Sequence, residues 1–276
     1  MKSKIHLQKL EDYSLDRVEQ FVRDSLEVLD TEASMFRPGH KVLLKPNLLK
    51  GFKPERCVTT HPVVVEAVCR VLKDLSVSQI VISDSPALGS LSAVADKAGY
   101  GLLEKKYGAR ILPLTNPIPF ENEEGVPHLK IAGCLEQYDR IINLPKVKSH
   151  CQMTMTLGIK NLFGLVIGKR KPVLHCLVKN DKIKFGKMLI CFSDSSWFSA
   201  SVPPIFTPKG ALGPDFGPEQ NFGKSRFLDP HRRGPPSARL QIATLSCSGG
   251  LLFEHVFATC FALFWCRGRV GEPAYI

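Results

Sequence analysis

Apolar residues recur along the first two thirds of the chain at two different spacings. Spacings of three and four residues predict amphipathic helices, and short unbroken apolar runs predict strands that are buried on both faces of a sheet. The predicted helices cover residues 14–30, 62–75, 92–98, 101–107 and 152–163, and the predicted strands cover residues 41–45, 79–84, 110–114 and 139–144. This alternation is typical of an α/β fold, with a Rossmann-like, mostly parallel sheet and helices on both faces.

The pattern breaks near residue 190. Beyond that point charged residues become sparser, phenylalanine and proline become more frequent, and prolines and glycines interrupt residues 193–239 too often for helices or strands to persist. We therefore expect one α/β domain over residues 1–190, truncated so that its sheet is incomplete at the C-terminus. Over residues 191–276 we expect an atypical tail that is disordered or results from a shifted reading frame.

Composition and charge exclude several classes of protein. Of the 276 residues, 44% are hydrophobic and 23% are charged, which is usual for a globular protein and excludes a wholly disordered or fibrous chain. The formal net charge of +11 permits an anionic ligand. The basic residues lack the interleaved aromatic side chains on which bases stack, so we expect no nucleic-acid partner.

The nine cysteines form no CxxC pair. A zinc ribbon or a ferredoxin-type cluster motif is therefore excluded, because those centres need closely spaced cysteine ligands. The irregular spacing and the absence of an apolar signal region favour reduced thiols and a cytoplasmic location. The longest apolar stretch, residues 251–265, is shorter than the roughly 20 residues that a membrane helix needs, so no membrane partner is expected.

Three segments place polar residues directly after predicted strands. In a doubly wound sheet, ligands bind beyond the carboxyl ends of the strands, so these segments should meet at a shared cleft. The residues expected to line the cleft are Lys45, Asn47, His61, Asp84, Lys148, His150, Lys160, Asn161 and His175.

The third segment, after the strand at residues 139–144, is the densest in polar residues. A helix beginning near His150 would present unpaired N–H groups and a positive dipole end. Lys146, Lys148 and Lys160 would add cationic donors there, so the segment favours binding of carboxylate or phosphate groups. The structural alternative is a solvated basic loop followed by a core helix.

Structural interpretations compete with functional ones at single residues. His61 precedes Pro62 and is better explained as a helix cap than as a ligand. Asp84 could bind a metal or cap the turn that follows it, and the turn is favoured. Cys151 lies near the predicted helix start, where a thiol pKa can fall, but no general base is paired with it, so a structural role is favoured. No GxGxxG fingerprint and no P-loop occur.

Several of these segments resemble the domain of unknown function family 362. The resemblance is carried by Lys45-Pro-Asn-Leu, Thr59-Thr-His-Pro, Ser83-Asp-Ser-Pro, Leu144-Pro-Lys-Val-Lys-Ser-His, and residues 156–165 with the later His175. It covers about residues 1–190. Members of that family often carry ferredoxin-like iron–sulfur modules, which implies a possible ferredoxin-like partner, although this chain has no cluster motif of its own.

Residues 150–175 are also distantly similar to the nickel-pincer lactate racemase family. Lys160 follows His150 by ten positions, Gly158 lies just before Lys160, and His175 comes later. The resemblance implies that His150 transfers protons, that Lys160 anchors a nickel-pincer cofactor covalently, and that His175 ligates the metal.

These observations lead to one expected function and one alternative. We expect an enzyme-like domain that binds an anionic small molecule or cofactor at the strand ends and is inactive as a truncated chain. The alternative is an accessory electron-transfer domain associated with an iron–sulfur module. The cofactor and the reaction stay open. The expected catalytic residues are His150 and Lys160, the expected binding residues are Lys45, Asn47, Asp84, Lys148 and Asn161, and the expected metal ligand is His175.

Overall fold

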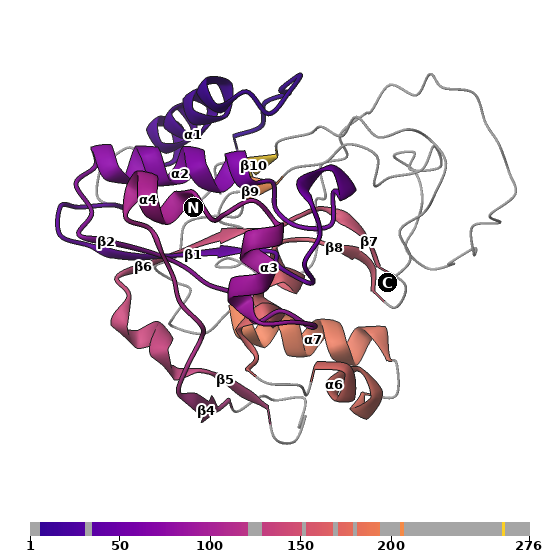
Figure 1. Ribbon diagram of the computed structural model, residues 1–276. Helices are drawn as coiled ribbons and strands as arrows, with labels where there is room; N and C mark the ends of the chain where they lie inside the picture. The colour runs from indigo at the N-terminus through magenta and orange to yellow at the C-terminus, as the bar shows by residue number, and fades with distance from the viewer. Residues whose placement is uncertain are drawn as a thin grey trace, which may run out of the picture.

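A parallel sheet lies at the centre of the computed structural model (Figure 1). Its four strands pair in the order β3-β2-β1-β6, and every pairing is parallel, as predicted. The strands are β1 Lys41–Pro46, β2 Gln79–Ile82, β3 Arg110–Ile111 and β6 Arg140–Leu144. The structure describes residues 6–30, 35–120, 129–150, 153–167, 171–178 and 181–193, together with residues 205–206 and 261–262.

Helices and small strand pairs surround this sheet. The helices are α1 Leu15–Leu29, α2 Pro62–Asp74, α3 Leu91–Lys97, α4 Leu103–Tyr107, α5 Gly158–Leu162, α6 Lys171–Leu177 and α7 Lys182–Ser193, with short 3-10 helices at Pro54–Arg56, Gly133–Gln137 and Phe163–Leu165. The additional pairs are antiparallel β4 Pro117–Pro119 with β5 Lys130–Ala132, antiparallel β7 Lys148–His150 with β8 Thr154–Thr156, and parallel β9 Ile205–Phe206 with β10 Phe261–Ala262.

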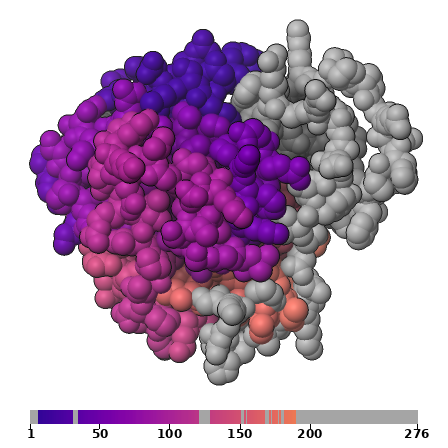
Figure 2. All heavy atoms as spheres, in the orientation of Figure 1, coloured from indigo at the N-terminus to yellow at the C-terminus, as the bar shows by residue number. Residues whose placement is uncertain are grey.

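Both faces of the sheet are covered, because successive strand residues point in opposite directions. Val42 and Leu44 of β1 pack into one core with α1 and α2, whereas Leu43 packs into a second core with α6 and α7. Figure 1 shows α1, α2 and α4 on one side of the sheet and α6 and α7 on the other. In the space-filling view, α1 and the segment from α6 to α7 lie at opposite ends (Figure 2). The predicted α/β fold with helices on both faces is confirmed.

The chain changes direction across the sheet at β1. It passes from β1 through α2 to β2 on one side, whereas β6 pairs with the other side of β1. In open α/β sheets, such a reversal leaves a crevice at the carboxyl ends of the strands, where ligands bind. The ends of β1 and β6 therefore border the expected position of a site.

The helix predicted over residues 152–163 is wrong in its first half. The strands β7 and β8 form an antiparallel hairpin there, and helix α5 begins only at Gly158. Thr154 and Thr156 are β-branched and favour a strand over a helix. No helix start lies near His150, so the expected dipole contribution to an anion site is absent at that position.

Three further expectations concern the tail, the cysteines and membrane spans. The tail predicted over residues 191–276 lies outside the described residues, apart from the end of α7 and the short strands β9 and β10, and so does Cys151. Cys57 is disulfide-bonded, which corrects the expectation that every cysteine is reduced, whereas Cys69, Cys134 and Cys176 are free. Among the described helices, none has the length and apolar character required to cross a bilayer.

Candidate functional site

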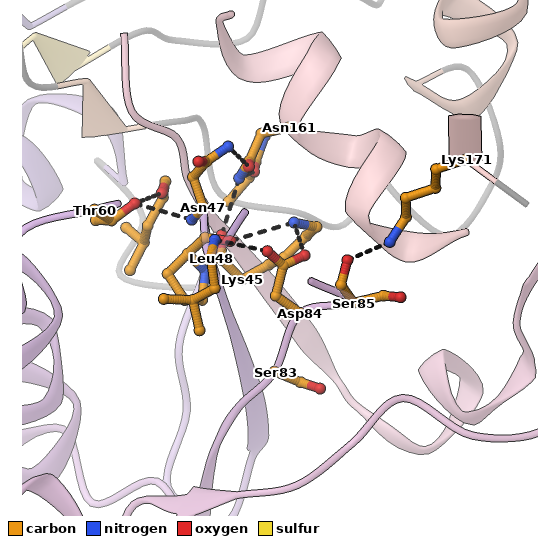
Figure 3. A network of polar contacts seen from close by, with 12 residues as sticks. Lys45, Asn47, Leu48, Thr60, Ser83, Asp84, Ser85, Asn161 and Lys171 are labelled. Atoms are coloured by element: carbon orange, nitrogen blue, oxygen red, sulfur yellow. Dashed lines mark hydrogen bonds and ion pairs between the residues drawn. The ribbon is translucent and has the colours of Figure 1, made fainter. Parts of the chain in front are cut away.

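A buried ion pair joins the ends of β1 and β2 (Figure 3). Lys45 Nζ donates to Asp84 Oδ1 at 2.8 Å, and the two side chains are 0% and 5% exposed. The other carboxylate oxygen, Asp84 Oδ2, accepts a hydrogen bond from the backbone N–H of Leu48 at 2.7 Å. Both oxygens of Asp84 are thus occupied by other segments, so its carboxylate fastens two strand ends together and does not cap the turn after β2.

The 3-10 helix Phe163–Leu165 lies directly against this ion pair. A Cβ atom added to Gly164 would lie 2.0 Å from Asp84 Oδ1 and 2.5 Å from Lys45 Nζ. The carbonyl oxygen of Gly164 accepts a hydrogen bond from the N–H of Ser85 at 3.1 Å. A residue without a side chain is therefore required at position 164 for the backbone to approach the pair this closely.

Three asparagines connect β1, β6 and α5. Asn161 Nδ2 donates to Asn143 Oδ1 at 2.7 Å and to the carbonyl oxygen of Lys45 at 3.2 Å. Asn47 Nδ2 donates to Asn161 Oδ1 at 2.9 Å (Figure 3), and Asn143 Nδ2 donates to the carbonyl oxygen of Gly158 at 3.0 Å. These amides hold α5 against the strand ends, as expected if the polar residues after parallel strands meet at one edge.

Lys148 reaches from β7 back to the end of β1. Its Nζ donates to Asn47 Oδ1 at 2.9 Å and to the carbonyl oxygen of Val58 at 2.8 Å. Burial, together with the charges of Lys160 and Lys146 and partly opposed by Asp84, lowers the pKa of Lys148 to about 7. Both hydrogen-bond acceptors are neutral, and within the described part of the chain this ammonium forms no ion pair with a carboxylate.

Other lysines crowd the same edge. Burial lowers the pKa values of Lys146 and Lys171 to about 8, and it also lowers the pKa of Lys45. Lys171 Nζ donates to the carbonyl oxygen of Ser85 (Figure 3). Asp84 is the one carboxylate that raises the pKa of Lys45, Lys148 or Lys171 among the described residues. The edge therefore holds more positive than negative charge.

Two imidazoles lie side by side near Lys160 of α5. The ring centroids of His150 and His175 are 5.8 Å apart, and His175 also stacks on Phe185 at 4.2 Å. Burial, followed by the charge of Lys160, lowers the pKa of His150 to about 3 and the pKa of His175 to about 4. The Nζ of Lys160 lies 5.7 Å from the ring centre of Phe163. Both imidazoles are therefore neutral at neutral pH.

A metal centre is not completed by these residues. The described part of the chain contains no group of three or more histidine, cysteine, aspartate or glutamate side chains that could hold a metal ion. His150 and His175 supply two imidazoles, and the neighbouring Lys160 ammonium repels a cation. The donor set does not fit a resident nickel centre, so we derive no chemistry through one.

The structure brings most of the expected residues to one edge. Lys45, Asn47, Asp84, Lys148 and Asn161 share one network of hydrogen bonds. His61 lies beside this network but caps α2 by accepting a hydrogen bond from the N–H of Val63 at 3.4 Å, as the Pro62 signal indicated. Burial, with the nearby charge of Lys146, lowers its pKa to about 4.

Sequence reasoning missed the roles of Gly164, Thr60 and Lys171. Thr60 Oγ1 donates to the carbonyl oxygen of Leu144 at 2.6 Å and accepts from the N–H of Asn47 at 2.9 Å, which ties the loop before α2 to both strand ends. Thr60 directly precedes the helix-capping His61, and nothing in the sequence indicated a role for Thr60 of its own. Gly164 and Lys171 lie in the basic, glycine-containing stretch after residue 156, but their partners come from distant parts of the chain.

The depressed lysine pKa values predict a pH dependence of stability. The unfolded chain holds these protons up to about pH 10.5, whereas folded Lys146, Lys148 and Lys171 release them near pH 7 to 8, so folding releases protons and stability rises with pH. We expect the free energy of unfolding without added anions to increase by about 3 kcal/mol between pH 6.5 and 8.5. Urea denaturation across that range measures it.

The matched controls for this prediction are two lysine variants. Lys148→Met should flatten the pH dependence, and replacement of the exposed Lys182 by methionine should leave it unchanged. Above about pH 9, the raised pKa of the buried Cys69 thiol acts in the opposite direction, so the rise should become less steep there. Stability that falls between pH 6.5 and 8.5 would show that these lysines are not desolvated.

Comparison with known proteins places the chain in a family. It is 36% identical over 190 residues to a protein of Synechocystis sp. described as thylakoid-associated, an alignment that covers 69% of this chain and 59% of that relative. A crystal structure of a protein from Thermotoga maritima superposes with a TM-score of 0.46 at 11% identity, covering 70% of this chain and 51% of the other. The chain thus spans less than two thirds of the length of either relative.

A family model matches residues 42–205, a region that includes every residue of the strand-end network described above. Its description is Domain of unknown function (DUF362). The match covers more than half of the chain and agrees with the resemblance carried by the strand-end motifs. The chain belongs to the DUF362 family.

Proposed function

We propose that the cleft at the carboxyl ends of β1, β2 and β6 binds an anionic small molecule or cofactor. One observation carries the proposal, the excess of buried or half-buried ammonium groups over carboxylates. Among the described residues, Asp84, which Lys45 already engages, is the one carboxylate that acts on Lys148 and Lys171. The charges of Lys146 and Lys160 act on Lys148 as well.

A cluster of desolvated ammonium groups favours the binding of an anion. Desolvation and mutual repulsion disfavour the charged forms of the lysines, and an anion among them reverses both effects. Burial, followed by the charges of Lys160, His175 and Lys148, lowers the pKa of His150 to about 3, and an anion would offset the lysine charges. A bound anion would raise that pKa toward its ordinary value, so binding would bring His150 into the range in which an imidazole exchanges protons.

Within this proposal, the residues divide by role. Lys148 and Asn47 contact the ligand, Asn161 and Lys45 position them, and His150 with Lys160 forms the catalytic pair. The stacking of His150 against His175 and the effect of Lys160 on both imidazoles support this grouping. We assign no metal to His175, the expected metal ligand, because the donor set around it does not fit a metal centre within the described part of the chain.

Replacement of Lys160 by alanine tests the proposal. Lys160 is the third residue of the short helix α5, and its charge lowers the pKa of Lys148, Lys171 and both imidazoles. We expect Lys160→Ala to raise the melting temperature without ligand and to abolish the increase that phosphate or citrate produces in the wild type. Thermal melts at fixed ionic strength measure both effects.

Lys182→Ala serves as the matched control, because Lys182 is an exposed lysine at the start of another helix. It should leave the anion-induced shift intact. Equal shifts in Lys160→Ala and the wild type would remove Lys160 from the site. No shift in the wild type with either anion would contradict the proposed function.

We also propose a cytoplasmic location and no stable insertion into membranes. The free thiols of Cys69, Cys134 and Cys176 support a reducing compartment, whereas the disulfide at Cys57 is the feature that such a compartment would open. The relative from Synechocystis is described as thylakoid-associated. Cell fractionation followed by a high-salt wash of the membrane fraction tests this proposal. We expect the protein in the cytoplasmic fraction or in the salt wash, and recovery only in detergent extracts would overturn the proposal.

A further inference from the structure

The loop before α2 and the segment after β6 are bonded to each other at two points. Lys148 Nζ donates to the carbonyl oxygen of Val58 at 2.8 Å, and Thr60 Oγ1 donates to the carbonyl oxygen of Leu144 at 2.6 Å. The two segments therefore run side by side in opposite directions. In each segment, one residue lies midway between the two that make these bonds.

Those midway residues are Thr59 and Lys146, and both are buried. Thr59 is 2% exposed, and its Oγ1 has no hydrogen-bond partner. Lys146 is 3% exposed, and within the described residues its ammonium has neither a hydrogen-bond acceptor nor a carboxylate. Buried donors without acceptors are costly, and a charged donor is the most costly of all.

A second unsatisfied hydroxyl borders the same segment. Thr156 of β8 is the direct cross-strand partner of Lys148 in β7, so their side chains lie on one face of the hairpin. Thr156 is 3% exposed, and its Oγ1 also has no partner. Unsatisfied donors thus lie on both sides of Lys148, from the loop before α2 and from the hairpin.

We propose that Lys146, Thr59 and Thr156, grouped around Lys148, form a subsite for a phosphoryl group of the anionic ligand. This inference rests on the proposed function and names the chemistry of one end of the ligand. The donors come from three separate segments, which suits the three oxygens of a tetrahedral phosphoryl group better than the two coplanar oxygens of a carboxylate. Burial also lowers the pKa of Lys146 to about 8 with no acid opposing it, a cost that a phosphate dianion removes.

Calorimetric titration with inorganic phosphate at fixed ionic strength tests the subsite. Thr59→Val and Thr156→Val each remove one hydroxyl at constant volume, and Lys146→Met removes the charge. We expect each to weaken phosphate binding by roughly tenfold or more. Lys182→Met, which changes an exposed lysine elsewhere, should bind phosphate as the wild type does. Acetate should bind the wild type more weakly than phosphate.

The outcomes separate this inference from the proposed function. Wild-type binding of phosphate that all three variants retain would overturn the subsite while leaving anion binding in the cleft intact. Binding of acetate or citrate without binding of phosphate would do the same. Failure of the wild type to bind any of these anions would overturn both proposals. If Lys146→Met does not fold, the two threonine variants decide.

Discussion

Asp84→Asn will destabilise the folded protein by about 3–5 kcal/mol, because the change leaves the Lys45 ammonium buried without its counter-charge. Lys45 is 0% exposed, and its Nζ has one other acceptor, the carbonyl oxygen of Pro46 at 3.3 Å. The asparagine amide also removes the negative charge from the acceptor of the hydrogen bond that the Leu48 N–H donates to Asp84 Oδ2. Urea denaturation near pH 7 measures the loss.

The matched control removes both charges. A Lys45→Met, Asp84→Leu double variant eliminates the isolated ammonium and should recover most of the stability lost in Asp84→Asn, because buried ion pairs replaced by apolar residues of similar volume often cost little. A loss of less than about 1 kcal/mol in Asp84→Asn would show that water reaches Lys45 and that the pair is not truly buried.

Gly164→Ala will destabilise the protein by about 3 kcal/mol or more, because the new methyl group would overlap atoms that cannot move away. The Cβ would lie 2.0 Å from Asp84 Oδ1 and 2.5 Å from Lys45 Nζ. Either the 3-10 helix Phe163–Leu165 shifts outward or the ion pair separates. Thermal or urea denaturation measures the loss, and phosphate binding should weaken with it because the cleft is deformed.

Gly186→Ala controls for the general effect of replacing glycine by alanine. Gly186 lies within α7, and an added Cβ would meet nothing within 4 Å. Alanine is the better helix former, so this variant should gain about 0.5–1 kcal/mol. Equal changes in the stability of the two variants would contradict the close approach of Gly164 to the ion pair.

The sheet was predictable because its strands are unbroken apolar runs. Residues of β1, β2 and β6 face two cores, so both faces of each strand are apolar and polar residues do not alternate with apolar ones. The parallel arrangement follows from the helices between the strands. Parallel strands place their carboxyl ends together, which is why the order of strands and helices along the chain predicts Lys45, Asp84 and Asn143 at one edge. The strand predicted over residues 110–114 ends at Ile111, shortly before Pro113, which cannot donate to a ladder.

The hairpin β7–β8 was not predictable in the same way. Residues 152–163 contain apolar positions at helical spacing, but two threonines alternate with Met155 in the strand that forms. A short segment with few apolar residues is compatible with the spacing of a helix and with that of a strand. The strand is selected here by the pairing of Lys148 with Thr156, which forms only in the folded chain. The anion site expected at a helix start therefore depends on lysine side chains instead.

The partners of the buried polar groups also lie beyond sequence reasoning. Thr59 and Thr156 are ordinary threonines in the sequence, and their missing hydrogen bonds appear only once the loop before α2 and the hairpin meet at Lys148. Asp84 gave two local interpretations, a metal ligand and a turn cap. Its actual partners, Lys45 and Leu48, come from the neighbouring strand and the loop after it.

The central claim is that an anion binds among the lysines at the strand ends. The most direct measurement is the anomalous scattering from a crystal of the protein soaked in arsenate, which has the shape and charge of phosphate. The account predicts an arsenic peak within hydrogen-bond distance of the Lys146 and Lys148 ammonium groups, in the cleft bordered by β1 and β6. An empty cleft, with arsenate bound only at exposed lysines such as Lys182, would contradict it.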